Sequence, residues 1–287
     1  MTGKSQKAKD FIPTPITKIE DTGVPELWLQ DLVLKIIYFG GYLTGFEVAE
    51  RIALPFAGLV EYLLDNLKKD KFVEIRSQSG GIGAGAYQYS ITGAGTIRAR
   101  EALERSQYAG PAPVPISDYN QSIAAQASGR TFITQRLMRQ ALSGIILSQK
   151  TFHQIGPAVN SGTSMFLYGP PGNGKTSIAR AIGNMTSAET MFIPFSIYID
   201  GQVVKLFDSV NHELAADPDA TSAGTGSLRA SNRRDPRWVK IRRPFIVAGG
   251  ELTMDGLDLV FDETNKFYEA AFQMKANGGI FLIDDFG

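Results

Sequence analysis

The sequence predicts an α/β domain in the C-terminal half of the chain, built on a parallel sheet with flanking helices, and a smaller α+β domain in the N-terminal part. Three observations support this prediction. A glycine-rich octapeptide at residues 169–176 lies between a short apolar run and a helical pattern. A second apolar run, at residues 280–283, ends in two aspartates. Residues 26–107 contain apolar residues at helical spacing and two segments that alternate like strands.

The octapeptide Gly-Pro-Pro-Gly-Asn-Gly-Lys-Thr fits the phosphate-binding pattern G-x4-G-K-S/T. The glycines let the backbone wrap so that successive N–H groups point at one anion. Lys175 can place a positive charge on the β- and γ-phosphates, and the Thr176 hydroxyl can ligate Mg²⁺. We therefore expect ATP and Mg²⁺ to bind at the residues of this loop and the start of the next helix, namely Gly169, Pro170, Pro171, Gly172, Asn173, Gly174, Lys175, Thr176 and Ser177.

The context of the octapeptide favours a binding site over the alternative, which is a surface turn rich in glycine and proline. The apolar residues 165–168 predict a buried strand before the loop. Residues 176–185 predict a helix whose N-terminal end faces the phosphates. A strand, a loop and a helix in this order are the setting that a phosphate-binding loop requires.

Residues 280–283 predict a buried parallel strand whose C-terminal end carries Asp284 and Asp285. In phosphoryl transfer, one such aspartate helps to hold Mg²⁺ and a neighbouring acid can orient the attacking water. We assign Asp284 to the metal and Asp285 to the water, which gives Lys175, Asp284 and Asp285 as the predicted catalytic residues. The alternative is an acidic turn after a core strand, which would be the better interpretation without the phosphate loop.

These two motifs resemble those of the AAA+ ATPase superfamily, whose members commonly carry G-P-P-G-x-G-K-T and, later, four apolar residues followed by two acids (the Walker A and Walker B motifs). The resemblance covers about residues 130–287. The first motif matches fully, whereas Asp285 stands where the family usually has the longer glutamate. Residues 276–285 are also similar to the A-x-G-G-x-L-F-L-D-E stretch of insertion-bearing members, among them MoxR-like chaperone ATPases and enhancer-binding activators.

The resemblance implies a P-loop NTPase fold that binds ATP and ADP, hydrolyses ATP with Mg²⁺, and assembles as a homo-oligomeric ring, a hexamer when full length. The family's sensor strand, arginine finger and helical lid would lie beyond Gly287. We therefore expect this chain to contain an incomplete AAA+ core, truncated after the Walker B motif, and to turn ATP over slowly. The segment before the phosphate loop lines the adenine pocket in the family, which makes Ile155 and Gly156 candidates. The nearby His153 is expected at the surface or in the core.

The composition limits the functions that the chain could have. Its 29 basic and 29 acidic residues cancel, so no global field attracts nucleic acid or membrane. The absence of cysteine excludes a disulfide framework and a thiolate metal site. No apolar run approaches the roughly 18 residues that span a bilayer, and residues 1–10 lack the apolar core of a signal peptide. We expect a cytoplasmic protein with no membrane partner.

Residues 24–108 predict a winged-helix-like domain, an α+β winged helix-turn-helix. Three helices are expected first. One covers residues 26–39, the next begins at the capping-box pair Thr44 and Glu47, and the third runs from Pro55 to Lys69. Two strands at residues 72–76 and 87–91 flank a glycine-rich wing, and a last helix covers residues 92–107. Acidic residues slightly outnumber basic ones in this segment, whereas a DNA-binding surface needs an excess of positive charge. We therefore favour docking of a protein substrate or adaptor, and nucleic-acid binding is the less favoured alternative.

The remaining segments complete the predicted domain organisation. A helix is expected at residues 123–155, and Gly156-Pro157 should end it. A hairpin is expected at Asp200-Gly201 and a flexible loop at residues 214–227. A strand at residues 244–248 and a helix at residues 263–275 should follow. The arginine-rich segment 229–243 is a solvated edge, a subunit contact or a polyanion site. The domains are a flexible tail at 1–23, the winged-helix-like domain at 24–108, a proline-rich linker at 109–122, and the nucleotide-binding domain at 123–287 with an insertion at about 196–262.

The sequence as a whole predicts a Mg-ATP-binding ATPase that couples hydrolysis to the remodelling of a protein or other macromolecular partner, as chaperones do. One alternative is an ATP-controlled DNA-binding transcription regulator that uses the winged helix. Another is a nucleotide-binding scaffold in which hydrolysis is vestigial.

Overall fold

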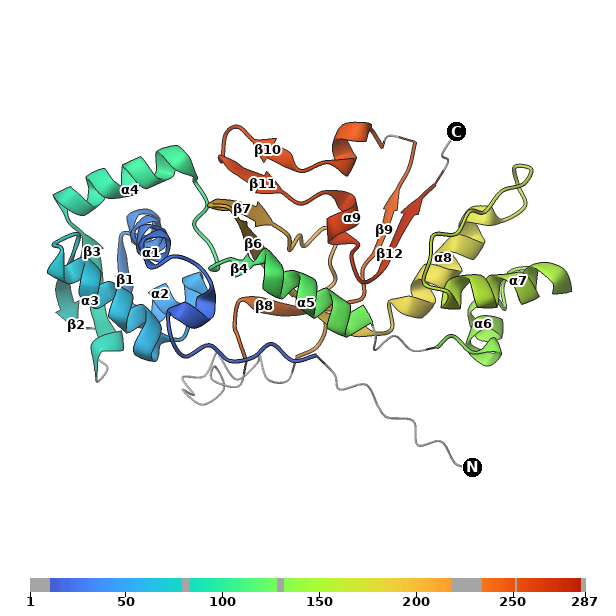
Figure 1. Ribbon diagram of the computed structural model, residues 1–287, viewed down its shortest axis with the longest axis horizontal. Helices are drawn as coiled ribbons and strands as arrows, with labels where there is room; N and C mark the ends of the chain where they lie inside the picture. Colours follow the sequence, from blue (N-terminus) through green and yellow to red (C-terminus); the bar gives the residue numbers. More distant parts are fainter. Residues whose placement is uncertain (1–10, 79–82, 128–131, 218–233, 251, 285–287) are drawn as a thin grey trace, which may run out of the picture.

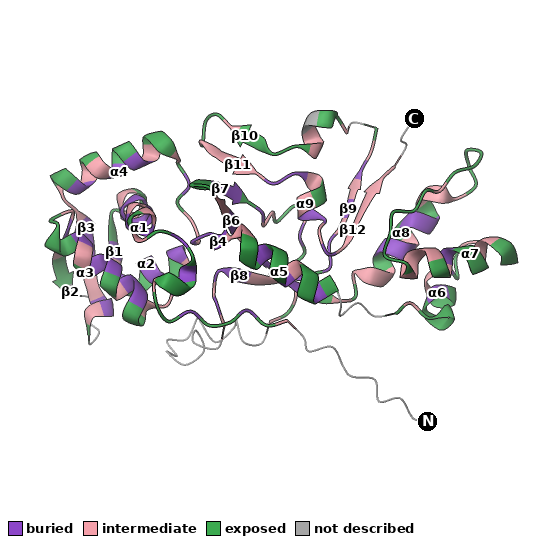
Figure 2. Cartoon of the chain, viewed as in Figure 1, coloured by how far each residue is buried: buried purple, intermediate pink, exposed green. Residues whose placement is uncertain are grey.

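A computed structural model describes residues 11–78, 83–127, 132–217, 234–250 and 252–284. Three regions follow one another along the long axis of the molecule (Figure 1): the N-terminal domain, a mixed sheet in the middle, and a lobe that contains α6 (Gln135–Ala141), α7 (Gln149–Asn160) and α8 (Lys175–Thr186). Figure 2 shows many buried residues inside the N-terminal domain, whereas β12 (Ile280–Ile283) in the third region is only half-buried. None of the described helices is both long and apolar enough to cross a bilayer.

The N-terminal domain has a core of aliphatic side chains from α1, α2 and α3, many of them fully buried. The capping box is confirmed: the Thr44 hydroxyl accepts from the amide of Glu47, whose carboxylate accepts from the amide of Thr44. Among the described strands, β1, β3 and β2 form an antiparallel sheet in that order. The elements are α1 (Glu26–Gly40), β1 (Tyr42–Thr44), α2 (Gly45–Ile52), α3 (Glu61–Lys69), β2 (Val73–Gln78), β3 (Tyr87–Ile91) and α4 (Gly93–Arg105).

The third helix of this domain does not begin at Pro55 as expected. Residues Phe56–Val60 form a distorted turn in which Ala57 is extended and Gly58 has a φ of 81°. A residue with this φ lies in the left-handed region, which glycine adopts at little cost and which no α-helix can contain. The regular helix α3 therefore begins only at Glu61.

The described part of the expected tail packs against the rest of the molecule, and the expected linker is partly in regular structure. Phe11 packs edge-on against Trp238 with ring centroids 5.6 Å apart, and Ile16 is buried. The linker contains a short strand, β4 (Val114–Pro115), which pairs with the mixed sheet, and the first turns of α5 (Ile116–Ala127). Buried arginine donors and apolar contacts hold these segments in place, and local composition does not reveal them. Residues 1–10 lie outside the described residues.

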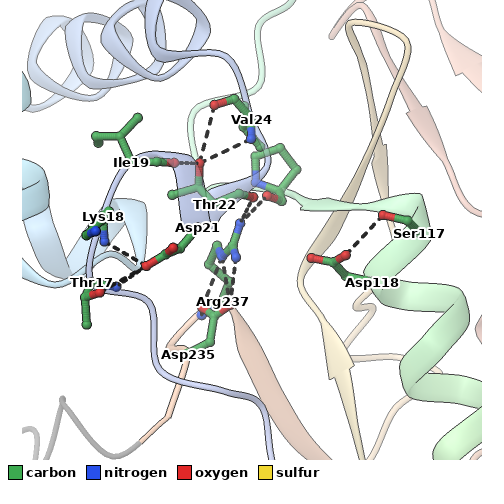
Figure 3. A network of polar contacts seen from close by, with 11 residues as sticks. Thr17, Lys18, Ile19, Asp21, Thr22, Val24, Ser117, Asp118, Asp235 and Arg237 are labelled. Atoms are coloured by element: carbon green, nitrogen blue, oxygen red, sulfur yellow. Dashed lines mark hydrogen bonds and ion pairs between the residues drawn. The ribbon is translucent and has the colours of Figure 1, made fainter.

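Figure 3 shows the arginine that connects both segments. The Arg237 guanidinium, 2 % exposed, forms an ion pair with Asp235 and donates from Nη1 to the carbonyls of Thr22 at 2.8 Å and Pro113 at 3.0 Å. A buried charge is tolerated only when it is paired and hydrogen-bonded, and this arginine meets both conditions. It therefore joins the start of the N-terminal domain and the segment before α5 to the start of β8 (Trp238–Arg242).

The middle of the molecule is a mixed sheet with the strand order β10-β11-β7-β6-β4. The predicted hairpin is confirmed between β6 and β7, where Asp200 and Gly201 both have positive φ, 46° and 88°. A separate antiparallel pair joins β5 to β8. The elements are β5 (Thr190–Pro194), β6 (Ser196–Ile199), β7 (Gln202–Lys205), β8 (Trp238–Arg242), β10 (Val260–Asp262) and β11 (Phe267–Glu269).

The helix expected at residues 263–275 is wrong for most of its length. Its first part forms the β10–β11 turn and β11, and only α9 (Phe272–Lys275) is helical. The turn is fixed by Asp262, whose carboxylate accepts from the amides of Thr264 and Asn265. Aspartate favours such turns because its side chain competes with the backbone of a helix.

The N-terminal domain packs directly on the mixed sheet. Trp28 of α1 contacts Tyr198 of β6 edge-on at 5.7 Å, and Val203 of β7 belongs to the core of the N-terminal domain. At the other side of the contact, the Lys266 ammonium donates to the carbonyl of Glu104 near the end of α4, at 3.0 Å. The two units thus share a continuous apolar contact.

The third region contains α6 (Gln135–Ala141), α7 (Gln149–Asn160), α8 (Lys175–Thr186), β9 (Phe245–Ala248) and β12 (Ile280–Ile283). The strand expected at residues 244–248 is present as β9, and β9 pairs with β12 in parallel. The single helix expected at residues 123–155 is wrong: Thr134 and Ser148 cap two new helices, and α7 continues through Gly156-Pro157. The expected parallel sheet is limited, among the described strands, to the β9–β12 pair, together with the parallel contacts β4–β6 and β7–β11.

Candidate nucleotide-binding site

The octapeptide forms an exposed loop that runs into α8, and its last two residues, Lys175 and Thr176, are the first two of that helix. Gly169, Gly172 and Gly174 have φ values of 150°, 80° and 73°, in the region that side chains disfavour. A Cβ atom at any of the three would meet no described heavy atom within 4 Å, so the space beside the loop is open. The helix expected at residues 176–185 is confirmed, and its first backbone hydrogen bond runs from Ile178 to the carbonyl of Gly174. The loop therefore presents the N-terminus of α8 to solvent.

Lys175 lies folded over this loop. Its ammonium donates to the carbonyls of Gly169 at 2.9 Å and Pro170 at 3.0 Å. These carbonyls are neutral acceptors, whereas a phosphate oxygen is charged and forms a stronger hydrogen bond with an ammonium group. A phosphate that enters the loop would replace them as the partner of Lys175.

Thr176 and Asp284 meet at the start of α8, although 108 residues separate them. The Thr176 hydroxyl donates to Oδ1 of Asp284 at 3.0 Å, and the amide of Asp284 donates to the carbonyl of Ala248 at 2.8 Å. Both side chains are half-buried. The structure thus brings together the two residues that the sequence assigned to the metal. Asp285 lies outside the described residues.

A hydroxyl and a carboxylate oxygen are suitable ligands for Mg²⁺, which proteins bind through one or two carboxylates together with phosphate oxygens and water. Among the described residues, no group of three or more His, Cys, Asp or Glu side chains is arranged to hold a metal ion. The pair Thr176 and Asp284 fits a Mg²⁺ ion that arrives with a nucleotide, because such an ion needs few protein ligands.

The position of α8 depends on apolar packing beneath the loop. Ile178 and Ile182 are buried against side chains of α6 and α7, together with Ile280 at the start of β12. On the side that faces β9, a Cβ atom at Gly183 would lie 2.4 Å from the Phe245 ring. The helix therefore approaches the β9–β12 pair more closely than a larger residue at position 183 would allow.

The buried strand expected before the loop is not present. Residues 165–168 have no regular structure, and Phe166 and Tyr168 are 75 % and 86 % exposed and stack on each other at 6.3 Å. Leu167 points the other way and joins the apolar cluster of α7 and α8. An apolar run becomes a strand only when a neighbouring strand accepts its hydrogen bonds, and none of the described strands pairs with this segment.

Ile155 and Gly156, the candidates for the adenine pocket, lie inside α7. Ile155 is 3 % exposed in the apolar cluster, and a Cβ atom at Gly156 would contact Met138 at 3.4 Å. The structure therefore gives both residues a packing role. His153 is exposed on the same helix, as expected for a histidine without a catalytic partner.

The arginine-rich segment is not an open polyanion surface over its described part. Arg237 and Arg243 are buried, and four arginines form ion pairs with acids: Arg234 with Asp217, Arg237 with Asp235, Arg242 with Glu213, and Arg243 with Glu189. Most of these acids lie far away in the sequence, so the charge run appeared uncompensated. Arg229 and Arg233 lie outside the described residues.

The model of the ATPase family associated with various cellular activities (AAA) matches residues 165–218, which include the phosphate loop, α8 and the β6–β7 hairpin. No curated protein shows a significant match. The family match supports an ATPase of the AAA type and a P-loop nucleotide-binding fold, and it ends well before Asp284.

Proposed function

We propose that this protein is a Mg-ATP-dependent ATPase that couples hydrolysis to the remodelling of a protein partner. The observation that carries the proposal is the contact between the Thr176 hydroxyl and the Asp284 carboxylate, 3.0 Å apart beside the phosphate loop. A phosphate loop alone indicates nucleotide binding. An aspartate placed against the loop threonine adds a site for the metal ion that phosphoryl transfer requires.

Each residue of the site has its own role in ATP binding or hydrolysis. The loop from Gly169 to Gly174 surrounds the phosphates, and the backbone N–H groups after its two prolines and in the first turn of α8, with Ser177, donate to them. Lys175 supplies the positive charge, Thr176 and Asp284 hold Mg²⁺, and Asp285 orients the attacking water. When bound by Thr176 and Asp284, Mg²⁺ would supply positive charge beside the transferring phosphoryl group.

The proposed assembly and partner follow from the AAA likeness. We infer an insertion-bearing, MoxR-like ATPase that forms a homo-oligomeric ring, a hexamer, in the cytoplasm. We propose that the N-terminal domain is winged-helix-like and that it would hold a protein substrate or adaptor. Its helix α3 exposes Tyr62 and Asp65 beside Lys68 and Lys69, which is a mixed surface suited to a protein.

The second candidate function is an ATP-controlled DNA-binding regulator. The antiparallel sheet β1-β3-β2 packed with α1, α2 and α3 is the arrangement that favours it. Binding of residues 24–108 to one DNA sequence at physiological salt would promote this candidate over the remodelling ATPase. DNA binding that disappears with rising salt and shows no sequence preference would not.

The proposed nucleotide site is tested by calorimetric titration of ATP with and without Mg²⁺. Lys175→Ala should abolish binding, because the loop loses its fixed positive charge. Lys150→Ala is the matched control, because Lys150 is an exposed lysine of α7 outside the loop. Equal ATP affinity in the wild type and in Lys175→Ala would refute the assignment of the site.

A further inference from the structure

Arg243 lies between β8 and β9 and is 5 % exposed. Its guanidinium donates in three directions: Nε to Oε2 of Glu189 at 2.6 Å, Nη1 to the carbonyl of Gly278 at 2.8 Å, and Nη2 to the carbonyl of Gln126 at 2.9 Å. Its own amide donates to the carbonyl of Glu189 at 2.8 Å. The planar fork of an arginine holds its partners in fixed directions, which the single ammonium group of a lysine does not.

Two of these partners stand at the far ends of the two elements that carry the candidate site. Glu189 follows α8 and Gly278 precedes β12. The helix begins beside Thr176 and runs away from the site, whereas β12 runs towards the site and ends beside Asp284. Arg243 therefore joins the two elements at the end opposite to the contact between Thr176 and Asp284.

The helix α8 is longer than the strand β12. The 12 residues of α8 span about 18 Å, at about 1.5 Å per residue. The chain of β12 from Ile280 to Asp284 spans about 13 Å, at about 3.3 Å per residue. The hydrogen bonds of Arg243 at one end and the contact between Thr176 and Asp284 at the other thus define how the helix lies along the strand.

Apolar packing holds these elements together but does not fix their relative direction. Ile178 and Ile182 of α8 share a cluster with Ile280 of β12, and Gly183 lies against Phe245 of β9. Apolar attraction has no preferred direction, so it permits a helix to tilt or slide on the strands. The hydrogen bonds of Arg243 are directional and oppose such movement.

A small tilt at the base matters at the site. Rotation of α8 by about 3° moves its other end by about 1 Å over about 18 Å. Misplacement by about 1 Å can lower a reaction rate about 10²-fold. We propose that Arg243 is a positioning residue of the nucleotide site, which fixes α8 against β12 and so sets the distance between the Thr176 hydroxyl and the Asp284 carboxylate. This inference rests on the proposed function.

The test compares Arg243→Lys with Arg242→Lys. Arg243→Lys keeps the positive charge but replaces the guanidinium that donates to Glu189, Gly278 and Gln126. The second is the matched control, because Arg242 is the preceding residue, is half-exposed and pairs with the exposed Glu213. ATP binding is titrated in EDTA and then at rising MgCl2 concentration, and phosphate release and the melting temperature are measured on the same samples.

We expect Arg243→Lys to bind ATP in EDTA with wild-type affinity, because the phosphate loop is unchanged. The Mg²⁺ concentration that gives half of the metal-dependent gain in affinity should rise about 10–100-fold, the usual effect of removing support around a metal ligand. The turnover number should fall more than KM for ATP changes. Arg242→Lys should keep the wild-type values.

A lower melting temperature with a wild-type Mg²⁺ midpoint would overturn the proposal, because Arg243 would then only stabilise the fold. If Arg243→Lys does not fold, Glu189→Gln decides, since it weakens the ion pair between Arg243 and the segment after α8. An unchanged Mg²⁺ midpoint in that variant overturns the proposal. A wild type that binds no Mg-ATP refutes the proposed function itself. A wild type that binds Mg-ATP, with an unchanged Arg243→Lys, refutes only the role of Arg243.

Discussion

Replacement of Arg237 by methionine should destabilise the protein by several kcal/mol. The guanidinium is 2 % exposed and the Asp235 side chain 4 % exposed, and their closest atoms are 2.8 Å apart. The same group donates to the carbonyls of Thr22 and Pro113. Arg237→Met leaves one buried carboxylate without its cation and two carbonyls without a donor. Removal of one partner of a buried pair costs about 3–5 kcal/mol, a large part of a typical stability of about 5–15 kcal/mol.

The exposed pair between Arg76 and Glu74 provides the control. Its nitrogen–oxygen distance is also 2.8 Å, but the two side chains are 59 % and 45 % exposed. An exposed pair contributes about 1 kcal/mol or less, so Arg76→Met should have little effect. The same distance should therefore give very different losses of stability, and burial is the variable that separates them.

Urea denaturation, followed by circular dichroism, measures the free energy of unfolding of each variant. The double variant with Arg237→Met and Asp235→Asn should recover about 1–3 kcal/mol relative to Arg237→Met, because the unpaired buried charge is gone. Asparagine can still accept from the amide of residue 237, as Asp235 does at 3.0 Å. A loss below about 1 kcal/mol in Arg237→Met would refute the argument that this arginine holds the N-terminal segment and the residues before α5.

Two further predictions concern the metal and the pH. Asp284→Asn should weaken Mg-ATP binding at least about 10-fold and leave ATP binding in EDTA unchanged; Asp118→Asn, at an exposed position, is the control in the same titration. Burial lowers the pKa of His212 below 6.5, against the opposing effects of the Lys275 carbonyl and the Asp208 carboxylate. As the pH falls, the unfolded chain therefore binds this proton before the folded chain does. The free energy of unfolding should keep its full value above about pH 6.5 and decrease below it. In urea titrations, the His153→Gln variant should lose as much stability at low pH as the wild type does, and the His212→Gln variant should lose less.

Local patterns in the sequence predicted the local parts of the structure. The phosphate loop, the helix after it, the capping box of Thr44 and Glu47 and the hairpin at Asp200-Gly201 all depend on residues within a few positions of each other. Their geometry follows from backbone preferences of glycine and from hydrogen bonds that a side chain makes to its own turn. The site contact between Thr176 and Asp284 was also expected, because both residues belong to motifs whose chemistry requires them to meet.

Contacts between distant segments explain what the sequence did not predict. The linker is folded because Val114 pairs with β6 and Arg237 donates to Pro113, and neither partner is visible from the prolines of the linker. The arginines at positions 234 and 243 are paired by acids that precede them by many residues. The run at residues 165–168 has the composition of a strand, but a strand also needs a neighbour, which composition cannot supply.

An ATPase that remodels a partner needs a connection between its nucleotide site and the surface that holds the partner. A flexible linker could not transmit movement, and the residues between the two domains do not form one here. Trp28 packs on Tyr198 of the mixed sheet, and Asp208, after β7, pairs with Lys275 of α9 at 2.8 Å. α9 leads directly into β12 and hence to Asp284. These contacts join the N-terminal domain to the mixed sheet, and the segment after the mixed sheet to the helix that precedes β12.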